Sequence, residues 1–248
     1  MEELKKNYMR RYVEKKKHKN TNLARVKDIA KAFLYTDIKS TKIEFVASHP
    51  FTNTWHTFLP NEIGVVDLHD EVCAYKWRKS LEGFIEQGDL LGIFSLMNKA
   101  YLLTFLKHTF DYISDLDLGR ILSRYWQSIE QISSDNNVKS NDIRKFFKTA
   151  NKYTLMNEEE LKAFERLDSY VEVYRGVTSY NRKRKNAFSW TTDKETAQWF
   201  ANRFGTGTGE VWTITVPKKR ILCLFEGREK ELVVDLYGYK EEYKVERV

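Results

Sequence analysis

The chain is poor in the residues that interrupt or cross-link a polypeptide. Its 248 residues include 3 prolines, 11 glycines and 2 cysteines. So few prolines and glycines leave little room for a long flexible linker, and no internal repeat is visible. Cys73 and Cys223 lie far apart, and neither belongs to a CxxC motif. We therefore expect no disulfide framework and no cysteine metal site, and a reducing cytoplasm is the simplest setting.

Long hydrophobic runs are also missing. The most apolar stretch, residues 90–110, contains Asn98, Lys99 and Lys107, so it predicts a buried helix and not a membrane span. The first residues have no apolar core of the kind that a signal peptide needs. We therefore expect a soluble, cytoplasmic protein with no membrane partner.

The histidines form no familiar metal-binding pattern. The spacings among His49, His56, His69 and Cys73 do not match those of known zinc sites. We interpret these histidines as exposed loop residues, and we expect no bound metal.

Positive charge is concentrated at the start of the chain. Residues 1–31 hold 11 of the 42 Lys and Arg but 4 of the 35 Asp and Glu, so their local balance equals the formal net charge of +7. The remainder of the chain is neutral. A basic head of this kind suits RNA, an acidic protein or an anionic membrane surface, and a solvated first helix is the alternative.

The hydrophobic pattern predicts an α+β protein, with a helical N-terminal part followed by a mixed, mostly antiparallel sheet. We expect a basic N-terminal segment over residues 1–36, a mainly helical region over 37–154 and a β-rich core over 155–248, which can pack with residues 70–154 as one domain. A short strand is expected at 42–47 and a loop at 49–61. The expected helices cover residues 21–35, 71–87, 90–110, 118–133, 141–152, 158–167 and 193–204. The expected caps are Asp117, Ser140, Asn157 and a Thr192–Glu195 capping box.

Four sequence features follow one another in the last third of the chain. Arg175 and Gly176 end an apolar strand, and Ser189-Trp190-Thr191 forms the next short strand. An amphipathic helix over 193–204 follows, and Glu229-Lys230-Glu231 leads into the strand Leu232-Val233-Val234. Each feature alone is common in a chain with 31% charged residues.

Taken together, these features resemble the Arg-Ser-Glu branch of the mono-ADP-ribosyltransferase superfamily, which includes bacterial ADP-ribosylating toxins and ecto-enzymes. In that family one strand presents an Arg and the next presents Ser-Thr-Ser, and after a helix a loop delivers Glu-x-Glu to another strand. The Ser189-to-Glu231 separation of 42 residues is similar to that of family toxins. Two departures stand out: the motif reads Ser-Trp-Thr, and Arg175 lies only 14 residues before Ser189. The resemblance covers about residues 155–248.

The resemblance implies an NAD-consuming glycosyl transfer without a metal. Cleavage of the nicotinamide bond of NAD leaves an oxocarbenium-like ribose, so the site must stabilise positive charge. The resemblance assigns this task to Glu231, and Ser189 is short enough to hydrogen-bond that carboxylate. Glu229 would orient or deprotonate the acceptor nitrogen. Arg175 would hold a phosphate or the ribose.

Further residues are expected to bind the NAD. The helix places Phe200 and Arg203 where the toxins keep a nicotinamide-facing Phe and a phosphate-binding Arg. Core packing for Phe200 and a solvated position for Arg203 are the alternatives. The remaining expected NAD contacts come from Gly176, beside Arg175, and from Thr191, which keeps the hydroxyl of the motif's second Ser.

The acceptor of the ADP-ribose is open among nucleic acid, protein arginine and, last, small molecules. In the family, Glu-x-Glu usually accompanies modification of protein arginine, yet some relatives modify nucleic-acid bases. The basic head and the run Arg182-Lys183-Arg184-Lys185 favour nucleic acid, RNA above all, because consecutive cations bind a phosphate chain. The same cations can instead hold the phosphates of NAD or remain solvated.

Two broader hypotheses accompany this one. The layout is compatible with an mRNA-modifying toxin of an anti-phage toxin–antitoxin system, whose helical half would bind the antitoxin. Alternatively, the chain is a non-catalytic nucleic-acid-binding or interaction protein with a vestigial transferase fold. Consumption of NAD by the purified protein separates these two classes.

Overall fold

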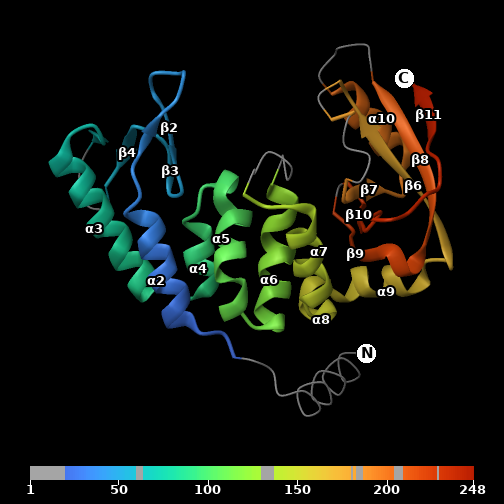
Figure 1. Ribbon diagram of the computed structural model, residues 1–248, viewed down its shortest axis with the longest axis horizontal. Helices are drawn as coiled ribbons and strands as arrows, with labels where there is room; N and C mark the ends of the chain where they lie inside the picture. The colour runs from blue at the N-terminus through green and yellow to red at the C-terminus, as the bar shows by residue number, and fades with distance from the viewer. Residues whose placement is uncertain are drawn as a thin grey trace. The chain divides into compact units, whose positions relative to one another are not determined.

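The computed structural model describes residues 20–59, 64–129, 137–179, 181–182, 187–203, 209–227 and 229–248. The chain divides into two compact units, residues 1–146 and 147–248, and the division falls within helix α7 (Ser140–Thr149) (Figure 1). Antiparallel strands and helices in both units give an α+β class, as expected. Most of the basic head, residues 1–19, lies outside the described residues.

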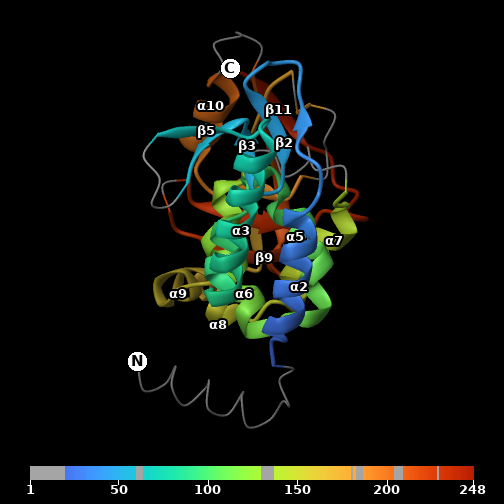
Figure 2. The ribbon, with the colours of Figure 1, turned by 90° about the vertical axis from the view of Figure 1, so that its left-hand side faces the viewer.

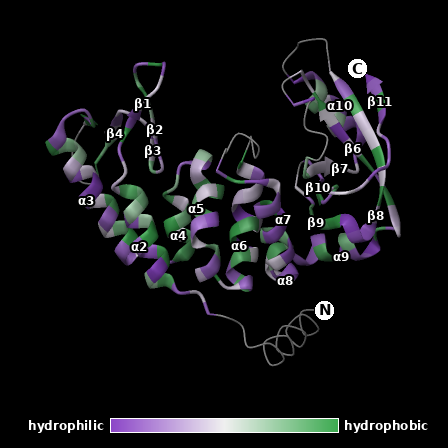
Figure 3. Ribbon diagram, in the orientation of Figure 1, coloured by the Kyte–Doolittle hydropathy of each residue, from purple (hydrophilic) through white to green (hydrophobic). Residues whose placement is uncertain are grey.

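The first unit is mainly helical. Its α-helices are α2 (Leu23–Leu34), α3 (Glu71–Gln87), α4 (Leu90–Ser95), α5 (Leu102–Thr109), α6 (Asp115–Tyr125) and the start of α7. Hydrophobic and hydrophilic residues are interspersed along these helices (Figure 3), as expected for amphipathic helices that bury one face. Figures 1 and 2 show α2 lying against α3 and α5, and Val26, Ala30 and Leu34 are the α2 residues buried there.

Caps explain most of the helix starts. Asp70 accepts from the Cys73 amide at the start of α3, whose bounds match the predicted 71–87. The predicted 90–110 helix is interrupted between α4 and α5, because the Asn98 side chain accepts from the Ala100 amide and starts a separate 3-10 turn. The predicted Asp117 cap is wrong: α6 begins earlier, and Ser114 accepts from the Asp117 amide.

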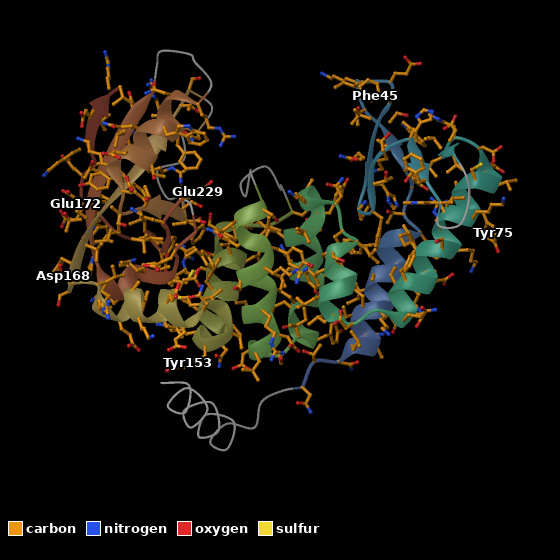
Figure 4. The ribbon with its side chains drawn as sticks, turned by 180° about the vertical axis from the view of Figure 1, so that it is seen from behind. Phe45, Tyr75, Tyr153, Asp168, Glu172 and Glu229 are labelled. Carbon is orange, nitrogen blue, oxygen red and sulfur yellow. The ribbon has the colours of Figure 1, made fainter. Side chains whose placement is uncertain are left out.

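Short strands form the rest of the first unit. A three-stranded sheet contains β1 (Lys39–Ser40), β2 (Val46–His49) and β3 (Thr52–Thr54), and a hairpin contains β4 (His56–Phe58) and β5 (Val65–Asp67). The strand predicted at 42–47 therefore begins later, and the loop predicted at 49–61 contains two strands. Pro50 occupies the turn between β2 and β3, where its missing N–H leaves the ladder intact. Figure 4 shows Phe45 near the tip of this sheet and Tyr75 on the outer side of α3.

The second unit is a six-stranded antiparallel sheet with helices packed on it. The order β11-β8-β6-β7-β10-β9 comprises β6 (Tyr170–Val177), β7 (Ser189–Thr191), β8 (Glu210–Pro217), β9 (Ile221–Phe225), β10 (Glu231–Val234) and β11 (Lys244–Arg247). Short helices α8 (Lys152–Leu155) and α9 (Glu158–Arg166) precede the sheet, and α10 (Lys194–Asn202) follows β7. The expected Asn157 cap of α9 is confirmed as a full capping box with Glu160. Residues 147–154, expected in the helical region, belong with this sheet unit.

Candidate active site

Arg175 joins the first two strands of the predicted motif. It lies on β6, half-buried, and its Nη1 donates to the Ser189 carbonyl oxygen at 2.6 Å. In the β6–β8 ladder it stands opposite Trp212. Burial raises the pKa of Tyr243 while the positive charge of Arg175 lowers it, so the two side chains lie near each other. Arg175 therefore holds the start of β7 beside the end of β6.

An aromatic cluster lies on the Arg175 face of the sheet. Trp190 and Tyr243 are stacked with ring centroids 5.8 Å apart, and Trp212 and Tyr243 lie 5.2 Å apart. Both tryptophans are buried. Because side chains alternate along a strand, Arg175, Trp190 and Trp212 share this face. Trp190 in the Ser-Trp-Thr motif therefore serves packing.

The opposite face brings the hydroxyls of β7 and Glu231 together. Glu231 opens β10 directly opposite Thr191, and Ser189 stands opposite Val233. Ser189 is thus a diagonal neighbour of Glu231 on the same face, at a Cα separation of about 7–8 Å in a regular ladder. Glu231 is 6% exposed. The register therefore makes Thr191, more than Ser189, the immediate cross-strand neighbour of this carboxylate.

The pKa of Cys223 indicates on which side of the sheet Glu231 lies. Burial raises the pKa of Cys223 well above its usual value, and the charges of Glu231 and Glu160 raise it further. Cys223 stands opposite Val233, on the same face as Ser189. Glu231 therefore points to the side of the sheet on which Glu160 and α9 lie.

Glu229 is exposed at the turn that precedes β10 (Figure 4). Glu229 and Glu231 are thus in different environments, one in solvent and the other nearly enclosed in the sheet. Among the described residues, Lys230 between them is the only non-glycine with a left-handed backbone, at φ 44°. Glu172, which Figure 4 also labels, is an exposed residue of β6.

Gly176 serves the packing of α10. A Cβ at this position would lie 2.3 Å from the Ala197 carbonyl oxygen and 2.6 Å from the Ala201 amide nitrogen. Gly209 approaches the same helix, and its Cβ would lie 2.4 Å from the Ala201 carbonyl oxygen. Two glycines and two alanines thus let α10 lie directly on β6 and β8. Packing against α10 is therefore sufficient to explain why residue 176 is a glycine, and no contact with NAD is needed to explain it.

Helix α10 carries the other predicted NAD contacts. Its cap is Asp193, whose Oδ1 accepts from the amides of Glu195 and Thr196, so the expected Thr192 cap is wrong. Phe200 is half-buried, edge-to-face with Trp199 at 5.0 Å, and the exposed Arg203 guanidinium is 5.8 Å from its ring centroid. Phe200 and Arg203 are therefore neighbours, and an aromatic face lies beside a cation.

The basic run before β7 is described only at its first member. The Arg182 guanidinium forms an ion pair with Glu210 at 2.7 Å, and Glu210 also accepts from the Trp212 indole at 3.0 Å. Arg182 thus anchors the turn after β6 to β8, which differs from the expected phosphate contact. Lys183, Arg184 and Lys185 lie outside the described residues.

Sequence reasoning missed three residues around these positions. Asp193 caps α10 and also contacts Lys230, whose Nζ lies 2.9 Å from Asp193 Oδ2. An Asp just before an amphipathic helix is a recognisable cap, so its local role was predictable. Asp193 pairs with Lys230, and Tyr243 lies beside Arg175. Both contacts join distant parts of the chain, so no local sequence pattern predicts them.

His49 differs from the expected exposed loop histidine. It is 1% exposed at the end of β2, edge-to-face with Trp77 at 5.3 Å. Its Nδ1 accepts from the Phe51 amide at 3.1 Å. Burial, and secondarily the charge of Arg78, lowers the pKa of His49 to about 4.

The described residues contain no cluster of three or more His, Cys, Asp or Glu arranged for a metal ion. No helix within the described ranges has the length and apolar character to cross a membrane. The first unit has a surface hollow of about 540 Å³, which Trp55, His69 and Tyr75 help to line. None of the predicted site residues that the structure describes lines that hollow.

Protein-family models, curated proteins and solved structures were compared with the chain, and none matches. The functional argument therefore rests on the residues themselves and on the geometry of the second unit.

Proposed function

We propose that the chain is an NAD-dependent mono-ADP-ribosyltransferase whose active site lies on the sheet of the second unit. The observation that carries the proposal is the order of the elements. Arg175 lies near the end of β6, β7 presents Ser189 and Thr191, α10 follows, and Glu231 begins β10 next to β7. This is the order that the family resemblance implies.

The contrast between the two glutamates supports a division of labour. A carboxylate enclosed in the sheet, such as Glu231, interacts strongly with a developing positive charge because little water screens it. An exposed carboxylate on a turn, such as Glu229, can meet an acceptor that arrives from solvent. The proposal assigns the ribose to Glu231 and the acceptor to Glu229.

The proposed reaction breaks the bond between ribose C1′ and the nicotinamide nitrogen. The bonding electron pair leaves with nicotinamide, and Glu231 stabilises the oxocarbenium-like ribose. An acceptor nitrogen then forms the new bond to C1′ and loses its proton, which Glu229 accepts. Phe200 and Arg203 offer an aromatic face and a cation for the nicotinamide ring and the phosphates.

The roles proposed for Arg175 and Gly176 differ from the NAD contacts that the sequence predicts. The bond from Arg175 to the Ser189 carbonyl supports a positioning role for β7. Because Arg175 lies on the face of the sheet opposite Glu231, the geometry does not support the predicted ligand contact of its side chain. The closeness of α10 to Gly176 supports a packing role for the glycine.

We propose nucleic acid, with RNA favoured, as the acceptor, and protein arginine as the alternative. The proposal rests on the basic head and on the cations after Arg182, because phosphate contacts supply most of the affinity of nonspecific nucleic-acid binding. The pairing of Arg182 with Glu210 reduces the expected contribution of the run by one cation. An antitoxin that binds the helical unit remains part of this proposal.

The decisive experiment is incubation of the purified protein with NAD labelled in the adenosine part, together with cell lysate. Label that nuclease releases identifies a nucleic-acid acceptor, and label that protease releases identifies a protein acceptor. Absence of both labelling and nicotinamide release would favour the non-catalytic alternative.

A matched pair of variants tests the site itself. Glu231→Gln should lower nicotinamide release by at least about 100-fold, which corresponds to about 2.7 kcal/mol of transition-state stabilisation. Glu165→Gln alters an exposed carboxylate on α9 and should leave the rate unchanged. Near-normal turnover in a folded Glu231→Gln protein would remove Glu231 from its proposed role.

A further inference from the structure

The turn between β9 and β10 is fixed at both ends. At its start, the Glu226 amide donates to Glu160 Oε1 at 3.2 Å, while Glu160 Oε2 accepts from the Asn157 amide at 2.7 Å. Glu160 is 8% exposed, so this end is tied to the start of α9 by an enclosed carboxylate. At the other end, the Lys230 amide donates to the Gly227 carbonyl at 3.0 Å. Glu229 lies between these two anchors.

The side chain of Lys230 adds a tie to α10. Its Nζ lies 2.9 Å from Asp193 Oδ2, and the other oxygen of Asp193 caps the helix through two amides at 3.0 and 3.1 Å. The hydrogen bond from Lys230, and secondarily that from the Thr196 amide, lowers the pKa of Asp193, and the same pairing raises the pKa of Lys230. Both groups are therefore charged at neutral pH. One carboxylate thus joins the helix start to the turn.

The unusual backbone conformation of Lys230 gives the ion pair with Asp193 a structural role. Its φ of 44° lies in the left-handed region, which a residue with a side chain seldom adopts without support from its surroundings. Relaxation of Lys230 to an ordinary φ would redirect the chain between Glu229 and Glu231. This conformation therefore sets the position of Glu229 relative to Glu231, which pairs with Thr191 on β7 and with Phe225 on β9.

We propose that Lys230 is a positioning residue, whose ion pair with Asp193 holds the turn so that Glu229 faces the acceptor while Glu231 stays enclosed. This inference rests on the proposed transferase function. It assigns Lys230 no contact with NAD or with the acceptor. Loss of the ion pair should therefore affect transfer to the acceptor more than hydrolysis of NAD.

Four variants of the full chain test the inference. Lys230→Met removes the charge, Asp193→Asn keeps a capping side chain but removes the charge, and a third variant combines both. Lys230→Arg keeps the charge. Lys194→Met is the matched control, because Lys194 lies in the first turn of α10 and pairs with Glu246 at 2.6 Å, away from the turn.

The measured quantity is the ratio of ADP-ribose transferred to ADP-ribose released by hydrolysis. Lys230→Met and Asp193→Asn should each lower this ratio by about 3- to 10-fold, and the combined variant should be no worse than either, because all three remove one interaction. Lys230→Arg and Lys194→Met should keep the ratio. Multiplied effects in the combined variant, or equal loss of transfer and hydrolysis, would overturn the inference.

A second readout separates this inference from the proposed function. If the wild-type protein releases no nicotinamide, the transferase proposal fails, and hydrogen exchange of residues 226–231 then tests the turn by itself. Faster exchange in Lys230→Met and Asp193→Asn, but not in Lys230→Arg, would support the tie. Unchanged exchange in every variant would refute it.

Discussion

The absence of a side chain at Gly176 allows α10 to lie close to the sheet. Gly176→Ala would place a Cβ against backbone atoms of α10, which cannot move aside as a flexible side chain can. We expect the free energy of unfolding of the second unit to fall by about 1–3 kcal/mol, the usual effect of overpacking. Urea denaturation, followed by a probe in the second unit, measures this change.

Gly83 provides the control for that substitution. It lies within α3, and a Cβ there would have no neighbour within 4 Å. Gly83→Ala should therefore leave stability unchanged or raise it by up to about 1 kcal/mol, because alanine favours the helix. Equal destabilisation by the two substitutions would contradict the packing role of Gly176.

His49 makes the first unit sensitive to acid. Its folded pKa of about 4 lies below the usual histidine value of 6.5, so the unfolded chain binds the proton more tightly. Stability is therefore complete above about pH 6.5 and falls as the pH is lowered towards 4, by on the order of 3 kcal/mol. Protonation of Nδ1 would also remove the acceptor of the Phe51 amide. Unfolding free energies measured across this pH range test the expectation.

The comparison variant for this effect is His49→Asn. An Asn side chain can accept the same amide two residues on, but it does not titrate. The variant should be less stable at every pH, yet its stability should change less between pH 6.5 and 4. An unchanged pH dependence would mean that other groups control acid unfolding.

At the scale of elements, the proposed function assigns different chemical steps to the two glutamates of the turn before β10. If the exposed Glu229 serves the acceptor and Glu231 serves the ribose, Glu229→Gln should abolish transfer while slow hydrolysis of NAD to free ADP-ribose continues. Separate assays of labelled acceptor and free ADP-ribose measure the two activities. If both fall equally, Glu229 supports NAD binding or the turn and has no special role in transfer.

The helices could be predicted because their signals are local. The bounds of α3 and the capping box of α9 follow from residues within one turn of the helix start. The strands β3 and β4 could not be predicted, because three residues are too few to show alternation. The break after α4 depends on Asn98, whose side chain replaces a helical hydrogen bond.

The candidate site likewise has features that the sequence predicts and features that it does not. The order of Arg175, Ser189 and Glu231 along the chain predicts which strands carry them. It does not predict the register, which places Thr191 opposite Glu231. Nor does it predict the pairing of Arg182 with Glu210 across 28 residues, since ion pairs between distant positions depend on the packed sheet.

At the scale of the whole molecule, the uneven charge predicts how salt affects substrate binding. If the acceptor is nucleic acid, binding releases counterions, and affinity should fall with salt by about 0.7 log units per phosphate contact per decade for single strands. Replacement of Lys183, Arg184 and Lys185 by Gln should flatten that slope and weaken modification of every sequence alike. Filter binding of labelled RNA at several salt concentrations measures the slope.

Two further measurements complete this test. Replacement of Lys39, Lys42 and Lys99, exposed lysines outside the proposed basic segments, removes the same charge and should leave the slope unchanged. An increased KM for NAD in the first variant would instead assign those cations to the NAD phosphates. Labelling that is insensitive to salt would favour protein arginine as the acceptor.

The two edges of the six-stranded sheet are protected from other chains in different ways. β11 is exposed along its whole length, and its charged residues, Lys244, Glu246 and Arg247, disfavour intermolecular strand pairing. β9 is a five-residue apolar strand, and the outward Leu224 amide donates to Met156 Sδ at 3.4 Å, while α9 packs over the strand. Replacement of Met156 by Ala would remove this covering side chain and leave part of the β9 edge open. Met156→Ala should therefore lead to aggregation that begins at β9.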